Sequence, residues 1–182
     1  MPRANFSGKW IRSQYESEPG EGEKFLLALG RNVIEAGLAI RSSEVQLASH
    51  FLIDGEHFVH TQVRMRVLKV KKHDYGISLF IDGKREKQKA DAKGFGDCTS
   101  VSRFVSDSCY KTIYFLANKK NLEVTRTLVN ANLIRVDLEV VCAGVRTRCV
   151  KLYERSQSLS AGEREIVELM NKGREQELYT AV

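Results

Sequence analysis

The feature that most constrains this chain is a two-residue alternation of apolar and polar side chains, repeated between turn signals over most of its length. The clearest stretch is 59–67, where one face holds Val59, Thr61, Val63, Met65 and Val67 and the other holds His60, Gln62, Arg64 and Arg66. A strand with this pattern buries one face of an antiparallel sheet and exposes the other. Turn pairs such as Asp54-Gly55 and Asp82-Gly83 separate such segments. Counting the segments between turns predicts about ten strands joined by short loops.

One helical stretch interrupts this pattern near the N-terminus. Residues 23–41 carry apolar side chains at helical spacing, broken at Gly30-Arg31-Asn32, which predicts two short helices joined by a turn. An acidic segment, 16–23, lies between these helices and a first strand at 5–14. Because no second strand–helix–strand unit follows, a parallel sheet is not expected. The predicted fold is an all-β, up-and-down antiparallel barrel of ten strands with a helix-turn-helix lid.

The end of the chain has a different pattern. Ser160-Ala161-Gly162-Glu163 fits a capping box, and apolar residues follow it at helical spacing. We expect an amphipathic helix at 161–178, within a tail of 157–182 that is appended to a barrel domain of 1–156. Three roles suit such a helix: packing on its own barrel, lying on a membrane, or binding a protein partner.

Three motifs in this layout carry a resemblance to a known family. They are Phe6-Ser7-Gly8-Lys9-Trp10, Phe25-Leu26-Leu27-Ala28-Leu29-Gly30 and Tyr153-Glu154-Arg155. Together they resemble the intracellular lipid-binding family of fatty-acid-binding proteins and cellular retinoid-binding proteins, in the calycin superfamily. The resemblance covers residues 5–155 and implies a clam-shaped barrel with Trp10 at its bottom and a ligand inside. The acidic segment 16–23 and the tail depart from the family's pattern.

The number of strands independently predicts a hollow interior. A barrel of eight strands is just wide enough for its own side chains to fill or for one small ligand. A ten-stranded barrel is wider, and aromatic residues make up only 8% of this chain, so large side chains are not in surplus to fill it. We therefore expect the interior to hold water or a ligand.

One cation shares an otherwise apolar strand face. Leu122, Val124 and Leu128 lie on one side of the alternation that follows Asn121, and Arg126 lies on the same side. A guanidinium in apolar surroundings needs a carboxylate, which either the protein or a ligand must provide. In the resembled family an inward Arg at this place binds the ligand carboxylate, and we expect this role for Arg126. An outward side chain and an internal salt bridge are the alternatives.

The last strand is expected to bring further polar groups inside. The resembled family ends in Arg-x-Tyr with both side chains inward, and the matching residues here are Lys151 and Tyr153. Lys151 keeps the positive charge but lacks the two-pronged guanidinium, whereas the Tyr153 hydroxyl can donate to a carboxylate. A β-bulge in this strand would bring Arg148 inward instead.

Apolar contacts with a ligand are expected from the lid and from the wall. The candidates are Phe25, Leu26, Leu122, Val124, Leu138 and Val140. Burying about sixteen methylenes contributes roughly 13 kcal/mol before the costs of binding, which remove several kcal/mol. The chain of the ligand therefore provides most of the affinity, and the polar residues select the head group. The expected ligand is a long-chain fatty acid or a similar carboxylated lipid, with a retinoid or another hydrophobic ligand as the alternative.

The net charge of +6 favours anionic partners. Lys69, Lys71, Lys72 and His73 cluster in a predicted loop, where we expect transient contact with an anionic membrane. Nucleic acid is the alternative for a basic surface, but only Tyr75 is near enough for base stacking, so nucleic-acid binding is not expected. The sequence has no nucleophile elbow, P-loop or dinucleotide motif, so enzymatic activity is not expected. No bound metal and no cofactor are expected either.

The cysteines and the first residues bear on location. Four cysteines occur without Cys-x-x-Cys spacing, and reduced thiols are the expected state. The chain begins without an apolar leader, so a cytoplasmic location is expected, with a secreted protein trimmed of its signal as the alternative.

Overall fold

The computed structural model describes most of the chain. The described residues are 3–15, 18, 20–53, 55–68, 70–84, 87–89, 98–116 and 119–180. Within them, the side chains of 14–15, 71–75, 87–89, 171 and 173–180 are not described. The sequence also predicts a turn at Gly94-Phe95-Gly96, which lies outside the described residues, as do residues 16, 17 and 19 of the acidic segment 16–23.

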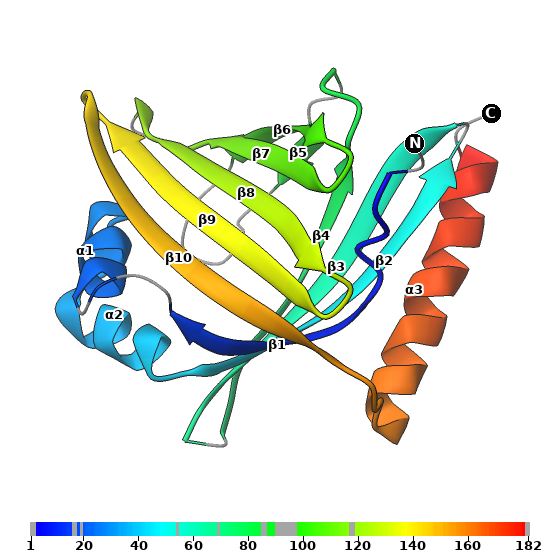
Figure 1. Ribbon diagram of the computed structural model, residues 1–182, viewed down its shortest axis with the longest axis horizontal. Helices are drawn as coiled ribbons and strands as arrows, with labels where there is room; N and C mark the ends of the chain where they lie inside the picture. Colours follow the sequence, from blue (N-terminus) through cyan, green and yellow to red (C-terminus); the bar gives the residue numbers. More distant parts are fainter. Residues whose placement is uncertain are drawn as a thin grey trace.

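Ten antiparallel strands form a single sheet, which confirms the predicted fold class (Figure 1). The strands are β1 (Gly8–Tyr15), β2 (Ser43–Ile53), β3 (Glu56–Val67), β4 (Val70–Phe80), β5 (Lys87–Lys89), β6 (Cys98–Ser106), β7 (Cys109–Phe115), β8 (Asn121–Asn130), β9 (Leu133–Cys142) and β10 (Val145–Ser156). Neighbours in sequence are neighbours in the sheet, except for β4 and β5, and β1 pairs with both β2 and β10. The spatial order therefore begins at β4 and ends at β5.

The sheet curls until its two ends approach each other. The amide of Gly83, just after β4, donates to the carbonyl of Ser102 on β6 at 2.7 Å. Asp82 and Arg103 form an isolated bridge at the same place. The continuous ladder of hydrogen bonds stops at β4 on one side and at β5 on the other. The two contacts described above bridge part of this gap, so the barrel is nearly closed.

Two short helices cover one end of the barrel. They are α1 (Glu21–Ala28) and α2 (Val33–Ile40), so residues 21–23 of the acidic segment already belong to α1. The Asn32 side chain caps α2 by accepting from the amide of Glu35 at 2.9 Å. Gly30 has a φ of 98°, a conformation that suits glycine, and it allows the chain to reverse between the helices. The predicted helix-turn-helix lid is confirmed.

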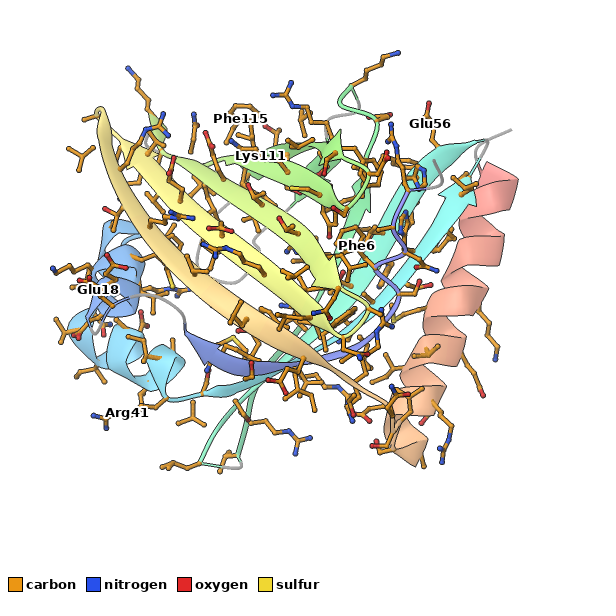
Figure 2. The ribbon with its side chains drawn as sticks, viewed as in Figure 1. Phe6, Glu18, Arg41, Glu56, Lys111 and Phe115 are labelled. Carbon is orange, nitrogen blue, oxygen red and sulfur yellow. The ribbon has the colours of Figure 1, made fainter. Side chains whose placement is uncertain are left out.

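The opening and closing motifs of the barrel meet at the other end. Trp10 is 1% exposed, and the guanidinium of Arg155 lies 4.2 Å from the centroid of its ring. Arg155 also donates to the carbonyl of Ser7 at 2.6 Å. Gly8 has a φ of 142°, a conformation that side-chain-bearing residues rarely adopt, and it leaves room for this guanidinium. Phe6, labelled in Figure 2, is buried beside Trp10 and accepts the indole N–H at its carbonyl.

The C-terminal helix, α3 (Ala161–Thr180), packs against the outside of the barrel at β2 (Figure 1). The predicted capping box is present: the amide of Glu163 donates to Ser160 Oγ at 3.3 Å, and the amide of Ser160 donates to Glu163 Oε2 at 2.7 Å. The same carboxylate pairs with Lys9 Nζ at 2.7 Å, which fixes the start of α3 to β1. Of the three predicted roles, packing on the barrel is thus observed. The division into domains at residue 156 stays a prediction.

No helix in the described part of the chain is both long and apolar enough to cross a bilayer.

We predict that Ser160→Ala weakens α3 and lowers the free energy of unfolding by about 1 kcal/mol, because the amide of Glu163 loses its side-chain acceptor. Urea unfolding followed by far-ultraviolet circular dichroism measures this change. Ser158→Ala is the matched control, since that exposed side chain lies two positions before the cap. Equal losses from the two variants would contradict the capping role.

Candidate functional site

The barrel encloses a cavity of about 420 Å³ beneath α1 and α2. Small-molecule sites usually have volumes of about 300–1,000 Å³, so this cavity is large enough for a ligand. Its wall is built by side chains from both lid helices and from the inner face of the sheet, most of them apolar. The hollow interior predicted from the number of strands is therefore present.

Most of the predicted apolar contacts lie in the wall of this cavity. Phe25 and Leu26 reach it from α1, and Leu122, Val124 and Leu138 reach it from β8 and β9. Val140 is different: it is 1% exposed and packs in the hydrophobic core, but it is not part of the described cavity wall. Its expected contact with a ligand chain stays a prediction.

Arg126 points into the cavity from β8, on the same face as Leu122 and Val124. Its guanidinium lies 5.6 Å from the ring centroid of Tyr110 on β7. Burial raises the pKa of Tyr114 to about 12, although the Arg126 charge acts to lower it. Burial also raises the pKa of Tyr110. At neutral pH, Arg126 is thus a cation among neutral phenols, and its expected role toward a ligand carboxylate stays a prediction.

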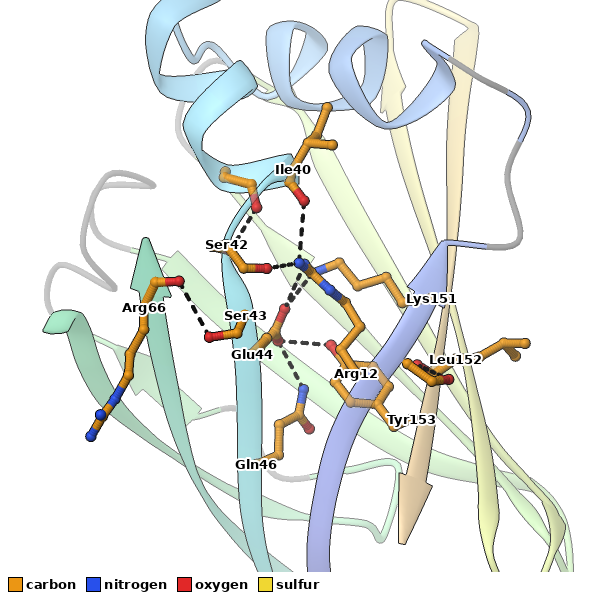
Figure 3. A network of polar contacts seen from close by, with 12 residues as sticks. Arg12, Ile40, Ser42, Ser43, Glu44, Gln46, Arg66, Lys151, Leu152 and Tyr153 are labelled. Atoms are coloured by element: carbon orange, nitrogen blue, oxygen red, sulfur yellow. Dashed lines mark hydrogen bonds and ion pairs between the residues drawn. The ribbon is translucent and has the colours of Figure 1, made fainter. Parts of the chain in front are cut away.

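A buried carboxylate, which sequence reasoning did not identify, lies in the same cavity (Figure 3). Glu44, from the start of β2, is 3% exposed. Its Oε1 accepts from the Tyr153 hydroxyl at 2.7 Å and from Gln46 Nε2 at 3.0 Å. Its Oε2 accepts from Lys151 Nζ at 2.9 Å and from Arg12 Nη1 at 3.4 Å. Each oxygen therefore has two donors, which is the full capacity of a carboxylate oxygen.

These partners keep Glu44 ionised despite its burial. Burial alone would raise the pKa of this carboxyl. The charge and hydrogen bond of Lys151, the Tyr153 hydroxyl and the charge of Arg12 outweigh that effect and lower the pKa to about 2. Glu44, Lys151, Tyr153 and Arg12 thus form a pre-formed network of charges and hydrogen bonds, and Gln46 provides the fourth donor to the carboxylate. We call it the Glu44 cluster.

Lys151 and Tyr153 face the cavity as their positions in β10 predict, and both belong to the Glu44 cluster. Arg148 does not face the cavity. The β9–β10 ladder runs without a register shift, and the Arg148 side chain is 56% exposed on the outer face, where it pairs with Asp137. The bulged alternative for the last strand is therefore wrong.

Arg12 connects the Glu44 cluster to the lid. While Nη1 contacts Glu44, Nη2 donates to the carbonyl of Ile40 at 3.3 Å and to that of Ser42. These carbonyls lie at the C-terminal end of α2, where helix carbonyls have no partners within the helix. The same side chain thus binds the buried carboxylate and holds the end of the lid.

Glu44 escaped sequence reasoning because β2 reverses the usual orientation of its alternation. Glu44 and Gln46 lie on the polar side of this strand, which a simple interpretation directs to solvent. In the structure they line the cavity, while Leu47, on the opposite face, is only 1% exposed. The tail helix α3, which packs on β2 from outside, accounts for an apolar outer face. The predicted amphipathic tail helix was the feature of the sequence that could have revealed this orientation, because its apolar side has to pack on an apolar strand face.

The side chains of the predicted basic cluster lie outside the described part of the structure. Lys69 lies outside the described residues, and the side chains of Lys71, Lys72 and His73 are not described. Among the side chains that are described, no group of three or more His, Cys, Asp or Glu residues is arranged to hold a metal ion.

Comparisons with known proteins identify the fold. No family model matches the sequence, and no curated protein sequence gives a significant match. The fluorescent protein UnaG has a TM-score of 0.65 at 14% identity, covering 83% of this chain and 97% of that chain. Lipid binding protein 8 of Caenorhabditis elegans has a TM-score of 0.60 at 11% identity, covering 83% and 95%. The fatty-acid-binding protein of Manduca sexta has a TM-score of 0.60 at 9% identity, covering 83% and 99%. The chain therefore has the clam fold of the lipid-binding proteins, as its motifs predict.

Glu44 should make the free energy of unfolding decrease at acidic pH. Its pKa falls from an ordinary 4.5 to about 2 on folding, so its contribution is complete above pH 4.5 and is lost as the pH falls toward about 2. Between about pH 6 and pH 3, we expect the free energy of unfolding to fall by about 2 kcal/mol more in the wild type than in Glu44→Gln. Urea unfolding at the two pH values measures the difference. The same loss in both proteins would show that Glu44 is not held ionised.

Proposed function

We propose that this protein is a non-enzymatic carrier that binds a long-chain fatty acid or a similar carboxylated lipid inside the barrel. The main support is a cavity of about 420 Å³ whose wall combines apolar side chains with an inward cation, Arg126. The clam fold shared with lipid-binding proteins agrees with this use.

The apolar wall accounts for affinity. Each methylene transferred from water into such a wall contributes about 0.8 kcal/mol, so a long acyl chain outweighs the loss of translational and conformational freedom. Phe25 and Leu26 on the lid and Leu138 on β9 are positioned to contact the chain. This part of the interaction does not discriminate between an acid and an alcohol of equal length.

The charges of the wall favour an anionic head group. Three cations, Arg31, Lys151 and Arg126, and two carboxylates, Glu35 and Glu44, line the described cavity. Arg31 lies 3.9 Å from Glu35, and Lys151 lies 2.9 Å from Glu44. The described wall residues therefore carry one net positive charge, to which Arg126 contributes beside the ring of Tyr110. A carboxylate beside Arg126 would neutralise it, and a fatty acid or a retinoid acid would both provide one.

The experiment that tests the function is ligand identification with a binding measurement. Native mass spectrometry of the purified protein, followed by organic extraction, names any copurified lipid. Displacement of a fluorescent fatty-acid probe from the delipidated protein then gives affinities. We expect acidic lipids to displace the probe at or below micromolar concentrations. Absence of probe binding, together with salt-sensitive binding to RNA, would contradict the proposal.

Arg126→Met should weaken the binding of hexadecanoic acid more than that of hexadecanol. We expect the acid to lose about 10- to 100-fold more affinity, because a charge-assisted hydrogen bond to the head group is removed. Arg135→Met is the matched control, since Arg135 pairs with Asp137 at 2.9 Å away from the cavity wall. Equal losses for acid and alcohol would contradict the assigned role of Arg126.

We further propose transport by transient contact with anionic membranes in the cytoplasm. The lid segment carries exposed apolar side chains, with Val33 63% and Ile34 76% exposed, and the exposed cations Lys24 and Arg41. Such a combination suits a surface that touches anionic lipid. The four cysteines are free thiols, which is consistent with a reducing compartment.

Transfer of a fluorescent fatty acid to vesicles containing phosphatidylserine should slow as salt rises, because salt screens the attraction between the basic surface and the lipid. Ile34→Ser should slow transfer at every salt concentration, since it removes an apolar contact with the bilayer. Vesicles of phosphatidylcholine alone provide the control. A transfer rate that ignores both salt and vesicle charge would exclude this route.

A further inference from the structure

Glu44 occupies the donors that the sequence assigns to a ligand. Lys151 and Tyr153 were expected to receive a ligand carboxylate, and in the structure both donate to the carboxylate of Glu44, at 2.9 Å and 2.7 Å. The protein thus supplies its own anion at this position, inside the same cavity that Arg126 lines.

We propose that Glu44 determines the head-group selectivity of the cavity, by holding Lys151 and Tyr153 so that an acidic lipid is bound through Arg126 and not through these two residues. The inference rests on the proposed lipid-binding function and adds which residue of the wall binds the acidic head group. The ligand class it names is a lipid with a single anionic group, placed at the Arg126 side of the cavity. Preference for acid over alcohol is accordingly lower than the three polar residues together would give.

The geometry makes Glu44 a fixed part of the wall. Its four donors fill the acceptor sites of both oxygens, so it has no capacity left for a ligand donor. Arg12, which is itself anchored on the carbonyls of Ile40 and Ser42, holds the carboxylate from the side of the lid. Swinging Glu44 away would leave Lys151 and Arg12 buried without their counter-ion, which is costly.

Electrostatics keep a second carboxylate away from Lys151. Two carboxylates that share one site in a poorly solvated interior repel, and one of them is then driven to take up a proton. Because Glu44 is bound by two cations and a hydroxyl, the incoming acid would be the one that loses its charge. Beside Arg126, in contrast, the acid keeps its charge and gains an attractive partner.

The test compares the affinities for hexadecanoic acid and hexadecanol in the wild type and in Glu44→Gln. Removing the charge of Glu44 releases Lys151 and Tyr153 to the ligand. The ratio of acid to alcohol affinity should therefore rise by about 10- to 100-fold, as expected for gaining a charge-assisted hydrogen bond. Glu123→Gln is the matched control and should leave the ratio unchanged, because Glu123 pairs with Lys111 outside the cavity wall, on the strand that carries Arg126. An unchanged ratio in Glu44→Gln overturns the proposal.

A double variant decides the question even if Glu44→Gln does not fold. Glu44→Gln with Lys151→Met removes both charges of the pair, so no lone lysine stays in the cavity, and Arg12 keeps its hydrogen bonds to the carbonyls of Ile40 and Ser42. If Glu44 and Lys151 neutralise each other in the wild type, removing both should leave the ratio of acid to alcohol affinity within about twofold of the wild-type value. A clear fall in the ratio would show that Lys151 already binds the ligand, and would overturn the proposal. If the wild type binds neither lipid, the proposed function itself fails and this inference fails with it.

Discussion

Charge inside a hollow, apolar barrel must be balanced locally, and the structure around the cavity follows this constraint. Water cannot stabilise an ion there, so each charge requires donors, acceptors or a counter-ion from the wall. Glu44 meets the requirement with two cations, a phenol and an amide, and the same Arg12 that neutralises it binds the carbonyls at the end of α2. The position of the lid, the inner face of β2 and the end of β10 are thus coupled through one buried carboxylate.

Much of this fold was predictable because its instructions are local. The alternation in 59–67 places Val63, Met65 and Val67 in the cavity wall, and the alternation after Asn121 places Arg126 there. The break at Gly30 and the cap at Asn32 specify where one lid helix stops and the next begins. Each of these features depends on a few neighbouring residues, so the sequence alone is enough to recognise it.

The polar site was less predictable because it depends on contacts between distant segments. Glu44 meets Tyr153 and Lys151 across more than a hundred positions, separated by 109 and 107 residues. Its orientation depends in turn on a tail helix that covers the other face of β2. Alternation states that β2 has two unlike faces, but not which one is inside. Val140 illustrates the same limit for an apolar residue, since alternation predicts that it is buried but not whether it meets the cavity or the core.

The place of β1 between β2 and β10 has a consequence for how the protein is made. The ladder that joins β1 to β10 pairs the first strand with the last, and the contact of Lys9 with Ser158 links residues 149 positions apart. A ribosome must therefore finish nearly the whole chain before its earliest strand finds its second partner. Until then one edge of β1 stays open, and proteins dominated by such distant pairings fold slowly and are exposed to aggregation while they wait. For a cell, the vulnerable moment of this molecule comes during its synthesis, before the barrel can close.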